Sequence, residues 1–174
     1  VEEPRWHVVL ETCAELVGVS ELAQPLLWCE SRELAVGPGG DILVPFLAID
    51  AGLLALDVSR AMLNETALRT LGAGLAGNTT LQRLTVREVP LNVQLLRTAA
   101  EITLHNVALG DGECTVVAEL CSNNLQLTSA NFQGCDKLTD VGVTALARAC
   151  TQLTFVDFAH CCKLTDVGVT ALAQ

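Results

Sequence analysis

The sequence predicts an α/β solenoid, and three observations lead to that fold class: an internal repeat, a strand, turn and helix pattern inside each repeat, and ample apolar residues. Residues 127–148 and 153–174 agree at 15 of 22 positions after an offset of 26 residues. Both copies contain the unbroken run KLTDVGVTALA. Apolar residues make up 51% of the 174-residue chain, which is more than enough to fill one core.

Each copy has a strand half and a helix half. Residues 153–158 fit an LxxLxL-type strand, and Cys161 then turns the chain. Apolar residues recur at helical spacing over residues 143–150, behind an N-cap at Asp140 or Thr139. A period in the twenties with this layout is the usual signature of leucine-rich repeats, whose units bury their apolar face only by stacking on neighbours.

One glycine is kept in the helix half of both copies. Gly142 and Gly168 occupy the same position near the start of the helix. Glycine in a helix costs up to ~1 kcal/mol relative to alanine. Its presence in both copies therefore predicts a close approach of another segment at this point.

The repeat resembles the cysteine-containing class of leucine-rich repeats, known from F-box proteins and from ciliary and other cytoplasmic scaffolds. A strand, a cysteine and then x-x-L-T-D-x-G-V-x-x-L-A-x-x-C carry the resemblance, which is specific over residues 127–174. It implies an intracellular leucine-rich-repeat solenoid with a curved parallel sheet on the concave side and helices on the convex side.

Weaker copies of the pattern precede this pair, and we count about six irregular repeats over residues 34–174, in a solenoid expected to continue beyond the chain. Only 18 residues separate Leu81 from Ala99, against 26 to 28 elsewhere, so a single helical turn around residues 93–96 is all that fits there. Val89 and Leu91 follow the preceding strand. The other expected strands lie around residues 34–36, 53–58, 81–86 and 99–104, and the expected helices contain residues 68–75 and 114–121.

Residues 1–33 are predicted to form a helical N-terminal cap, with helices over Pro4–Val17 and Ser20–Arg32. The pair resembles, weakly, an F-box. Glu3 and Arg32 depart from that pattern, and the alternative is a cap that covers the open end of the solenoid. The matching positions are Pro4, Leu10, Leu16, Leu22, Leu27, Trp28 and Cys29.

Composition argues against several classes of protein. The net charge is −10, and the 10 lysines and arginines are scattered, which opposes nucleic-acid binding. No run of about 18 apolar residues is present, so we expect no membrane insertion. Most of the cysteines fall on turn or helix positions of the repeat, where thiols act as small buried apolar groups. We therefore expect an intracellular, cytoplasmic protein. The more specific expectation is a location in the cilium or the cytoskeleton.

The repeat register also predicts which side chains point out of the concave face. These outward positions are mixed and polar, which is typical of a protein-binding surface. Arg83 and Arg87 can clamp a carboxylate or phosphate, or can instead pair with Glu101 or Asp57 on neighbouring strands. Phe155 is a candidate hydrophobic anchor if the surface is free, and the alternative is that it packs on the next unit of a longer solenoid. The predicted partner-binding residues are Asp57, Arg83, Arg87, Glu101, His105, Asn131, Gln133, Phe155 and Asp157.

The sequence predicts no catalytic residues, no metal site and no cofactor. There is no CxxC motif, and His160, Cys161 and Cys162 lack a second cluster with which to hold zinc. No spacing of nucleophile, base and orienting group is visible. The resulting hypothesis is a non-enzymatic protein–protein interaction scaffold, such as a structural subunit of a large intracellular assembly in the ciliary axoneme. The alternatives are an F-box-type substrate receptor that docks on a Skp-type adaptor of a cullin ubiquitin ligase, and an acidic inhibitor of a basic enzyme.

Overall fold

The computed structural model describes residues 27–30, 33–36, 53–61 and 63–173. Short strands and helices largely alternate from residue 55 onward, as the repeat pattern predicts. In chain order the elements are β1 (Leu27–Glu30), β2 (Glu33–Val36), β3 (Ala55–Asp57), α3 (Glu65–Ala76), β4 (Arg83–Val86), β5 (Val89–Asn92), α4 (Val93–Thr98), β6 (Glu101–Thr103), α5 (Asp111–Cys121), β7 (Ser129–Asn131), α6 (Asp140–Ala149), β8 (Phe155–Asp157) and α7 (Asp166–Leu172).

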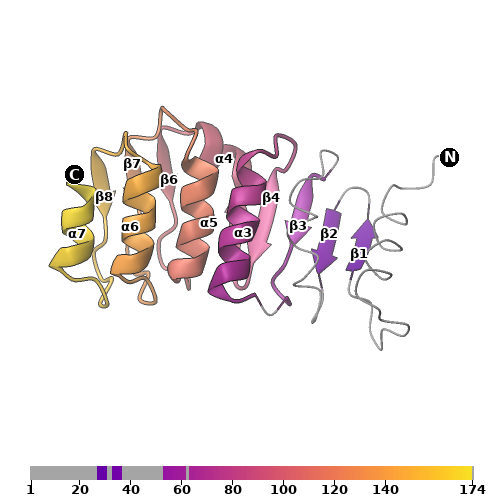
Figure 1. Cartoon of the computed structure of the whole chain (residues 1–174), viewed down its shortest axis with the longest axis horizontal. Coiled ribbons are helices and arrows are strands. Elements are labelled where there is room, and N and C mark those ends of the chain that lie inside the picture. Colours follow the sequence, from indigo (N-terminus) through magenta and orange to yellow (C-terminus); the bar gives the residue numbers. More distant parts are fainter. Residues whose placement is uncertain (1–26, 31–32, 37–52, 62, 174) are drawn as a thin grey trace.

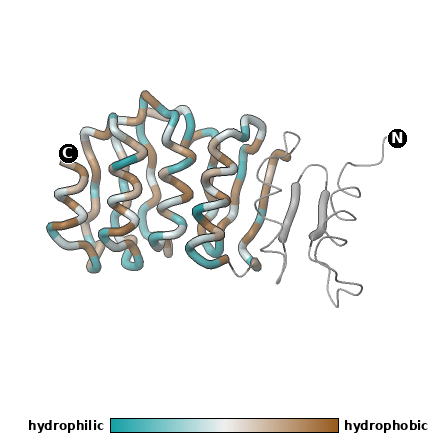
Figure 2. The backbone as a smooth tube through the Cα atoms, viewed as in Figure 1, coloured by the Kyte–Doolittle hydropathy of each residue, from teal (hydrophilic) through white to brown (hydrophobic). Residues whose placement is uncertain are grey.

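The elements form two layers. Figure 1 shows α3, α5, α6 and α7 side by side in front of the strands, and each of these helices contacts the next. Hydrophobic and hydrophilic stretches alternate along these helices in Figure 2, as expected when one face of each helix is buried against the strands. We call the two outer surfaces of the molecule the helix side and the sheet side.

The strands of the described residues belong to two sheets, a five-stranded sheet with the order β1-β2-β3-β4-β5 and a three-stranded sheet with the order β6-β7-β8. The predicted parallel pairing is confirmed for β2, β3 and β4 and for β6, β7 and β8. The expectation of one all-parallel sheet is wrong, because β1 pairs with β2, and β4 with β5, in antiparallel fashion.

A hairpin that the sequence analysis missed interrupts the parallel series. Val89 and Leu91, which were expected only to follow the preceding strand, lie in β5 and are buried, whereas Pro90 between them is exposed. This period-two alternation is that of a strand, and an exposed proline is tolerated at the edge of a sheet. The chain reverses at Arg87, whose φ of 50° lies in the left-handed region.

The short connection after β5 holds only the six-residue helix α4, close to the single turn expected around residues 93–96. Asn92 caps it by accepting a hydrogen bond from the Leu95 amide at 3.1 Å. Arg97 donates to the carbonyl oxygens of Leu75 and Leu81, at 2.9 and 3.2 Å. Because this return leg is short, α3 and α5 contact each other directly.

The N-terminal helix prediction fails where the structure describes the chain. Residues Leu27–Glu30, inside the predicted helix Ser20–Arg32, form strand β1 and pair with β2, while Leu34 and Val36 lie in a strand as expected. Pro25 cannot donate a hydrogen bond inside a helix, and the backbone of Leu27–Glu30 gains partners in the sheet. The helix predicted over Pro4–Val17, and the F-box positions up to Leu22, lie outside the described residues.

Apolar side chains at the predicted strand and turn positions fill the core. Leu56 and Leu84 are paired in register and buried, as are Ile102 and Ala130. Phe132 is fully buried, and its ring stacks on that of Phe158 with centroids 5.7 Å apart. The predicted register of the repeat is therefore confirmed at these positions.

The buried cysteines do more than fill space. The thiols of Cys135 and Cys161 each donate a hydrogen bond of 3.1 Å to a carbonyl oxygen of the preceding unit, Leu104 and Phe132 respectively. Burial raises the pKa of the Cys135 thiol to about 11, so this side chain stays protonated and able to donate. Cys114, Cys121 and Cys150 are buried as predicted.

A carboxylate at the start of one helix binds the start of the next. Asp111 accepts from the Thr139 hydroxyl at 2.7 Å and from the amides of Thr139 and Gly142 at 2.9 and 3.1 Å. The Asp140 carboxylate accepts equivalent hydrogen bonds from the amide of Thr165 at 2.9 Å and from the hydroxyl of Thr165 at 2.6 Å. These bonds lower the pKa of Asp140. We call the two sets of bonds the aspartate clamps.

The aspartate clamps decide two questions that the sequence left open. Thr139 is the N-cap of α6, because its hydroxyl accepts from the Val141 amide, and Asp140 instead serves the neighbouring unit. A Cβ atom at Gly142 would meet Oδ1 of Asp111 at 2.8 Å and its Cα at 3.2 Å. The close approach predicted from the retained glycine is thus confirmed.

Candidate protein-binding face

The strands place alternate side chains on the sheet side, at the positions that the repeat register predicted. In β4 and β6 the central residues Leu84 and Ile102 are buried, whereas Arg83 and Glu101 beside them are exposed. The predicted partner-binding residues on β3, β7 and β8 are half-buried or exposed. The predicted face therefore exists as a solvent-accessible surface of the described residues.

Side chains from three strands form rows across the second sheet. Glu101 of β6, Ser129 of β7 and Phe155 of β8 are neighbours in register, and so are Thr103, Asn131 and Asp157. Phe155 is 61% exposed, which leaves most of a phenyl ring in contact with water. An exposed aromatic ring beside polar side chains is the kind of group that anchors a protein interface.

Three of the predicted binding residues also hold the backbone turn that follows their own strand. Asp57, Asn131 and Asp157 each accept a hydrogen bond from the amide two residues further on, at 2.8, 2.9 and 2.8 Å. Asp and Asn commonly make such local bonds where a chain turns. Their equivalent positions in three repeats were the signal that could have revealed this structural role.

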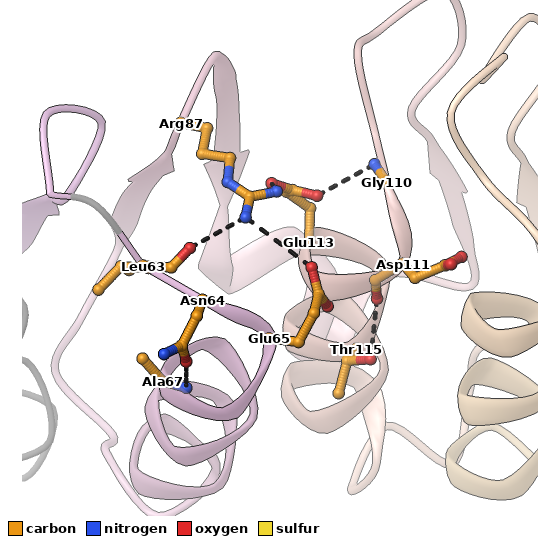
Figure 3. Close-up of polar contacts among 9 residues, drawn as sticks. All are labelled: Leu63, Asn64, Glu65, Ala67, Arg87, Gly110, Asp111, Glu113 and Thr115. Carbon is orange, nitrogen blue, oxygen red and sulfur yellow. Dashed lines mark hydrogen bonds and ion pairs between the residues drawn. The ribbon is translucent and has the colours of Figure 1, made fainter.

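Arg87 lies elsewhere than predicted. Its guanidinium donates to Oε1 of Glu113 at 2.7 Å and to the carbonyl oxygen of Leu63 at 3.0 Å, and it lies 3.8 Å from Glu65 (Figure 3). Its acidic partners are thus on α5 and α3, and not Glu101 or Asp57 on neighbouring strands as expected. A two-arginine clamp with Arg83 is therefore not formed.

Glu113 is a buried charge that Arg87 neutralises. The Glu113 side chain is 1% exposed, and its second oxygen accepts from the Gly110 amide at 3.1 Å, which caps α5. A buried carboxylate is costly unless it is paired and hydrogen-bonded. This network joins three segments of the chain in Figure 3 and stabilises the fold.

The remaining predicted residues are at least partly accessible to solvent. Arg83, Glu101, His105 and Phe155 are exposed, and Gln133 is half-buried. Arg83 lies in register with Ala55 and Asn92, in the other sheet from Phe155. The candidate binding surface is therefore the sheet side of β6, β7 and β8, with Phe155 as its largest apolar group.

Cys161, one of three residues weighed for zinc, is instead buried and bonded to Phe132. Within the part of the chain that the structure describes, no group of three or more histidine, cysteine, aspartate or glutamate side chains is arranged to hold a metal ion. Over the same residues, no helix combines the length and apolar character needed to cross a bilayer.

Comparison with known proteins bears on the C-terminal repeat. Residues 149–173 match a family model described as Leucine Rich repeat. The match spans one unit, from the end of α6 to the end of α7, and it supports a leucine-rich-repeat protein. No curated protein matches the chain.

Proposed function

We propose that this chain is a non-enzymatic protein–protein interaction scaffold that binds its partner on the sheet side of β6, β7 and β8. The observation that carries the proposal is the row of Glu101, Ser129 and the exposed ring of Phe155, on the surface opposite α5, α6 and α7. An aromatic anchor surrounded by polar side chains suits a protein partner. Small molecules instead bind mostly in concave sites.

The more specific form of the proposal is a structural subunit of a large intracellular assembly, for example in the ciliary axoneme. A leucine-rich repeat supports a role in binding proteins, and short units stacked through the aspartate clamps make a rigid support for such a surface. The alternative of an F-box-type receptor depends on residues 1–33, which would have to bind a Skp-type adaptor.

The test is affinity purification of the full-length protein from its native source at mild salt, followed by mass spectrometry. Phe155→Asp should remove the partners of the sheet side, while Lys137→Ala, an exposed turn residue, should keep them all. A stable set of assembly subunits would support the scaffold, and a cullin with its adaptor would support the F-box alternative. Unchanged partners with Phe155→Asp would contradict the proposed face.

The net charge of −10 leaves a third function to consider, an acidic inhibitor of a basic enzyme. Binding of that kind is dominated by charge and should weaken steeply between low and moderate salt. An interaction with the purified partner that is insensitive to salt would exclude it.

A further inference from the structure

A groove on the helix side runs between α5 and α6, opposite the proposed binding face. It is a hollow of about 730 Å³ that reaches from Arg69 on α3 to Val167 on α7. A second hollow of about 460 Å³, between α6 and α7, shares Thr144 and Val167 with it. The residues that line the first hollow between these ends are mostly small, and they include Thr115, Ala118, Ser122, Thr144, Ala145 and Ala149.

Two valines give the groove an exposed apolar rim. Val141 and Val167 are 66% and 69% exposed, and they occupy the same position, the second residue of α6 and of α7. Val141 belongs to a helix with neighbours on both sides, α5 and α7, so its exposure does not result from a missing neighbour. A single exposed valine is ordinary, but two along one groove provide an apolar surface that a partner can bury.

Two arginines border the same groove. Arg69 and Arg148 are exposed, and neither makes a hydrogen bond or ion pair with another described residue. The other described arginines are engaged, as Arg87 is with Glu113 and Arg97 with Leu75. Unpartnered guanidinium groups favour a carboxylate ligand, which they bind bidentately.

The acidic side chains of the groove do not satisfy these arginines. The carboxylate of Asp140 is held by the amide and hydroxyl of Thr165 in the second aspartate clamp. Glu119 lies over α3, where its methylene carbons would be 3.1 and 3.2 Å from a Cβ atom at Gly72. No salt bridge joins either acid to Arg69 or Arg148.

We propose that this groove binds an amphipathic α-helix of a partner protein, with its apolar face on Val141 and Ala145 and with aspartate or glutamate on the flank that faces Arg69 and Arg148. A helix laid in a groove is a common mode of peptide recognition, and it is read through apolar positions at i, i+3, i+4 and i+7. The site is separate from the sheet side and does not depend on the function proposed for that face.

The test uses two synthetic peptides of about four helical turns. One carries leucines at helical spacing with glutamates on the flanks, and the other has lysine in place of every glutamate. Binding of each labelled peptide to the whole chain is measured by fluorescence anisotropy. We expect the glutamate peptide to bind about tenfold more tightly, which corresponds to ~1.4 kcal/mol.

Variants locate the binding. Arg148→Glu should weaken binding of the glutamate peptide about tenfold and strengthen binding of the lysine peptide. Val141→Ser should weaken the binding of both peptides. Lys163→Glu, with the same change of net charge in an exposed turn outside the groove, should change neither by more than about twofold. All three positions are exposed, so the melting temperatures should match the parent protein.

Four results would overturn the proposal. Equal binding of the two peptides would show that the arginines do not select an acidic helix. Equal effects of Arg148→Glu and Lys163→Glu on binding would show that only the net charge of the protein matters. Loss of binding with Phe155→Asp would move the site to the sheet side. Concentration-dependent dimerisation abolished by Val141→Ser would identify a second copy of this chain as the occupant instead.

Discussion

Replacing Gly142 by alanine tests whether packing between units or local helix preference controls the start of α6. Helix propensity alone predicts that Gly142→Ala stabilises the protein by up to ~1 kcal/mol. The structure predicts the opposite sign, because the new Cβ atom would lie 2.6 Å from Cδ1 of Leu138 and 3.2 Å from the Cα atom of Asp111. The Leu138 side chain is fully buried, and the Cα atom belongs to the backbone, so neither can move without cost.

The magnitude follows from two opposed contributions. Overpacking of this kind costs typically ~1–3 kcal/mol, and displacement of the helix start would also weaken the 3.1 Å bond from the Gly142 amide to Asp111, a charged acceptor worth ~1.5–3 kcal/mol. After subtraction of the propensity gain, we expect Gly142→Ala to lower the free energy of unfolding by about 1–3 kcal/mol. For a chain of this size that lowers the melting temperature by about 3–10 °C.

Gly77→Ala is the matched control. Gly77 is the C-cap of α3, with a right-handed φ of −88°, and a Cβ atom there would meet nothing within 4 Å. Alanine at such a site should stabilise by ~0.4–1 kcal/mol, through loss of freedom in the unfolded chain. Thermal and urea unfolding followed by circular dichroism measure both variants. If Gly142→Ala raised the melting temperature as Gly77→Ala should, the packing argument would be refuted.

Three further predictions concern residues in the core, in the Arg87 network and in the clamps. Phe132→Ala should lower the free energy of unfolding, measured in urea, by ~3–5 kcal/mol, and Gln133→Ala should lower it by less than about 0.5 kcal/mol, since only Phe132 is buried. Equal decreases for the two variants would mean that the strand register is off by one. Arg87→Met keeps the side-chain stem but leaves the Glu113 carboxylate unpaired. Because the Arg87 side chain is itself 43% exposed, we expect the free energy of unfolding to fall by about 2 kcal/mol. A decrease of less than about 0.5 kcal/mol would disprove a structural role for Arg87. Asp140 has a lowered pKa, so its contribution to stability is present above its ordinary value of 3.8 and is lost as the pH falls through the folded value. Asp140→Asn should therefore melt below the parent at pH 7 and approach it in acid, and a gap that does not change with pH would rule out the carboxylate as the cause.

The sequence predicted most of the strands and helices from residue 53 onward, because each unit carries its own periodic signal. Leucines at strand spacing and apolar residues at helical spacing fall where the buried residues of β3, α3 and α6 are found. The outward register of Phe155 followed from the same spacing. These properties are local, so a short window of residues is enough to specify them.

Predictions failed where a residue's partner comes from another unit or another strand. Val89 and Leu91 were not assigned to a strand, although their alternation with exposed Pro90 is that of a strand, because the repeat pattern has no second strand at that point. The helix predicted across Leu27–Glu30 gave way to pairing with β2. Arg87 was placed on the sheet surface, but its left-handed backbone and its bond to Glu113 remove it from that face.

By itself, the sequence determined that this protein is built from repeated α/β units and which side of each unit is apolar, since both properties depend on spacing along a few turns of chain. The tertiary structure alone decided which carboxylate binds which helix start, which arginines are neutralised and which remain free beside a groove. A hydrogen bond requires a donor and an acceptor within about 3 Å. For Arg87 and Glu113, or Asp111 and Thr139, that proximity arises only when units more than 25 residues apart are stacked.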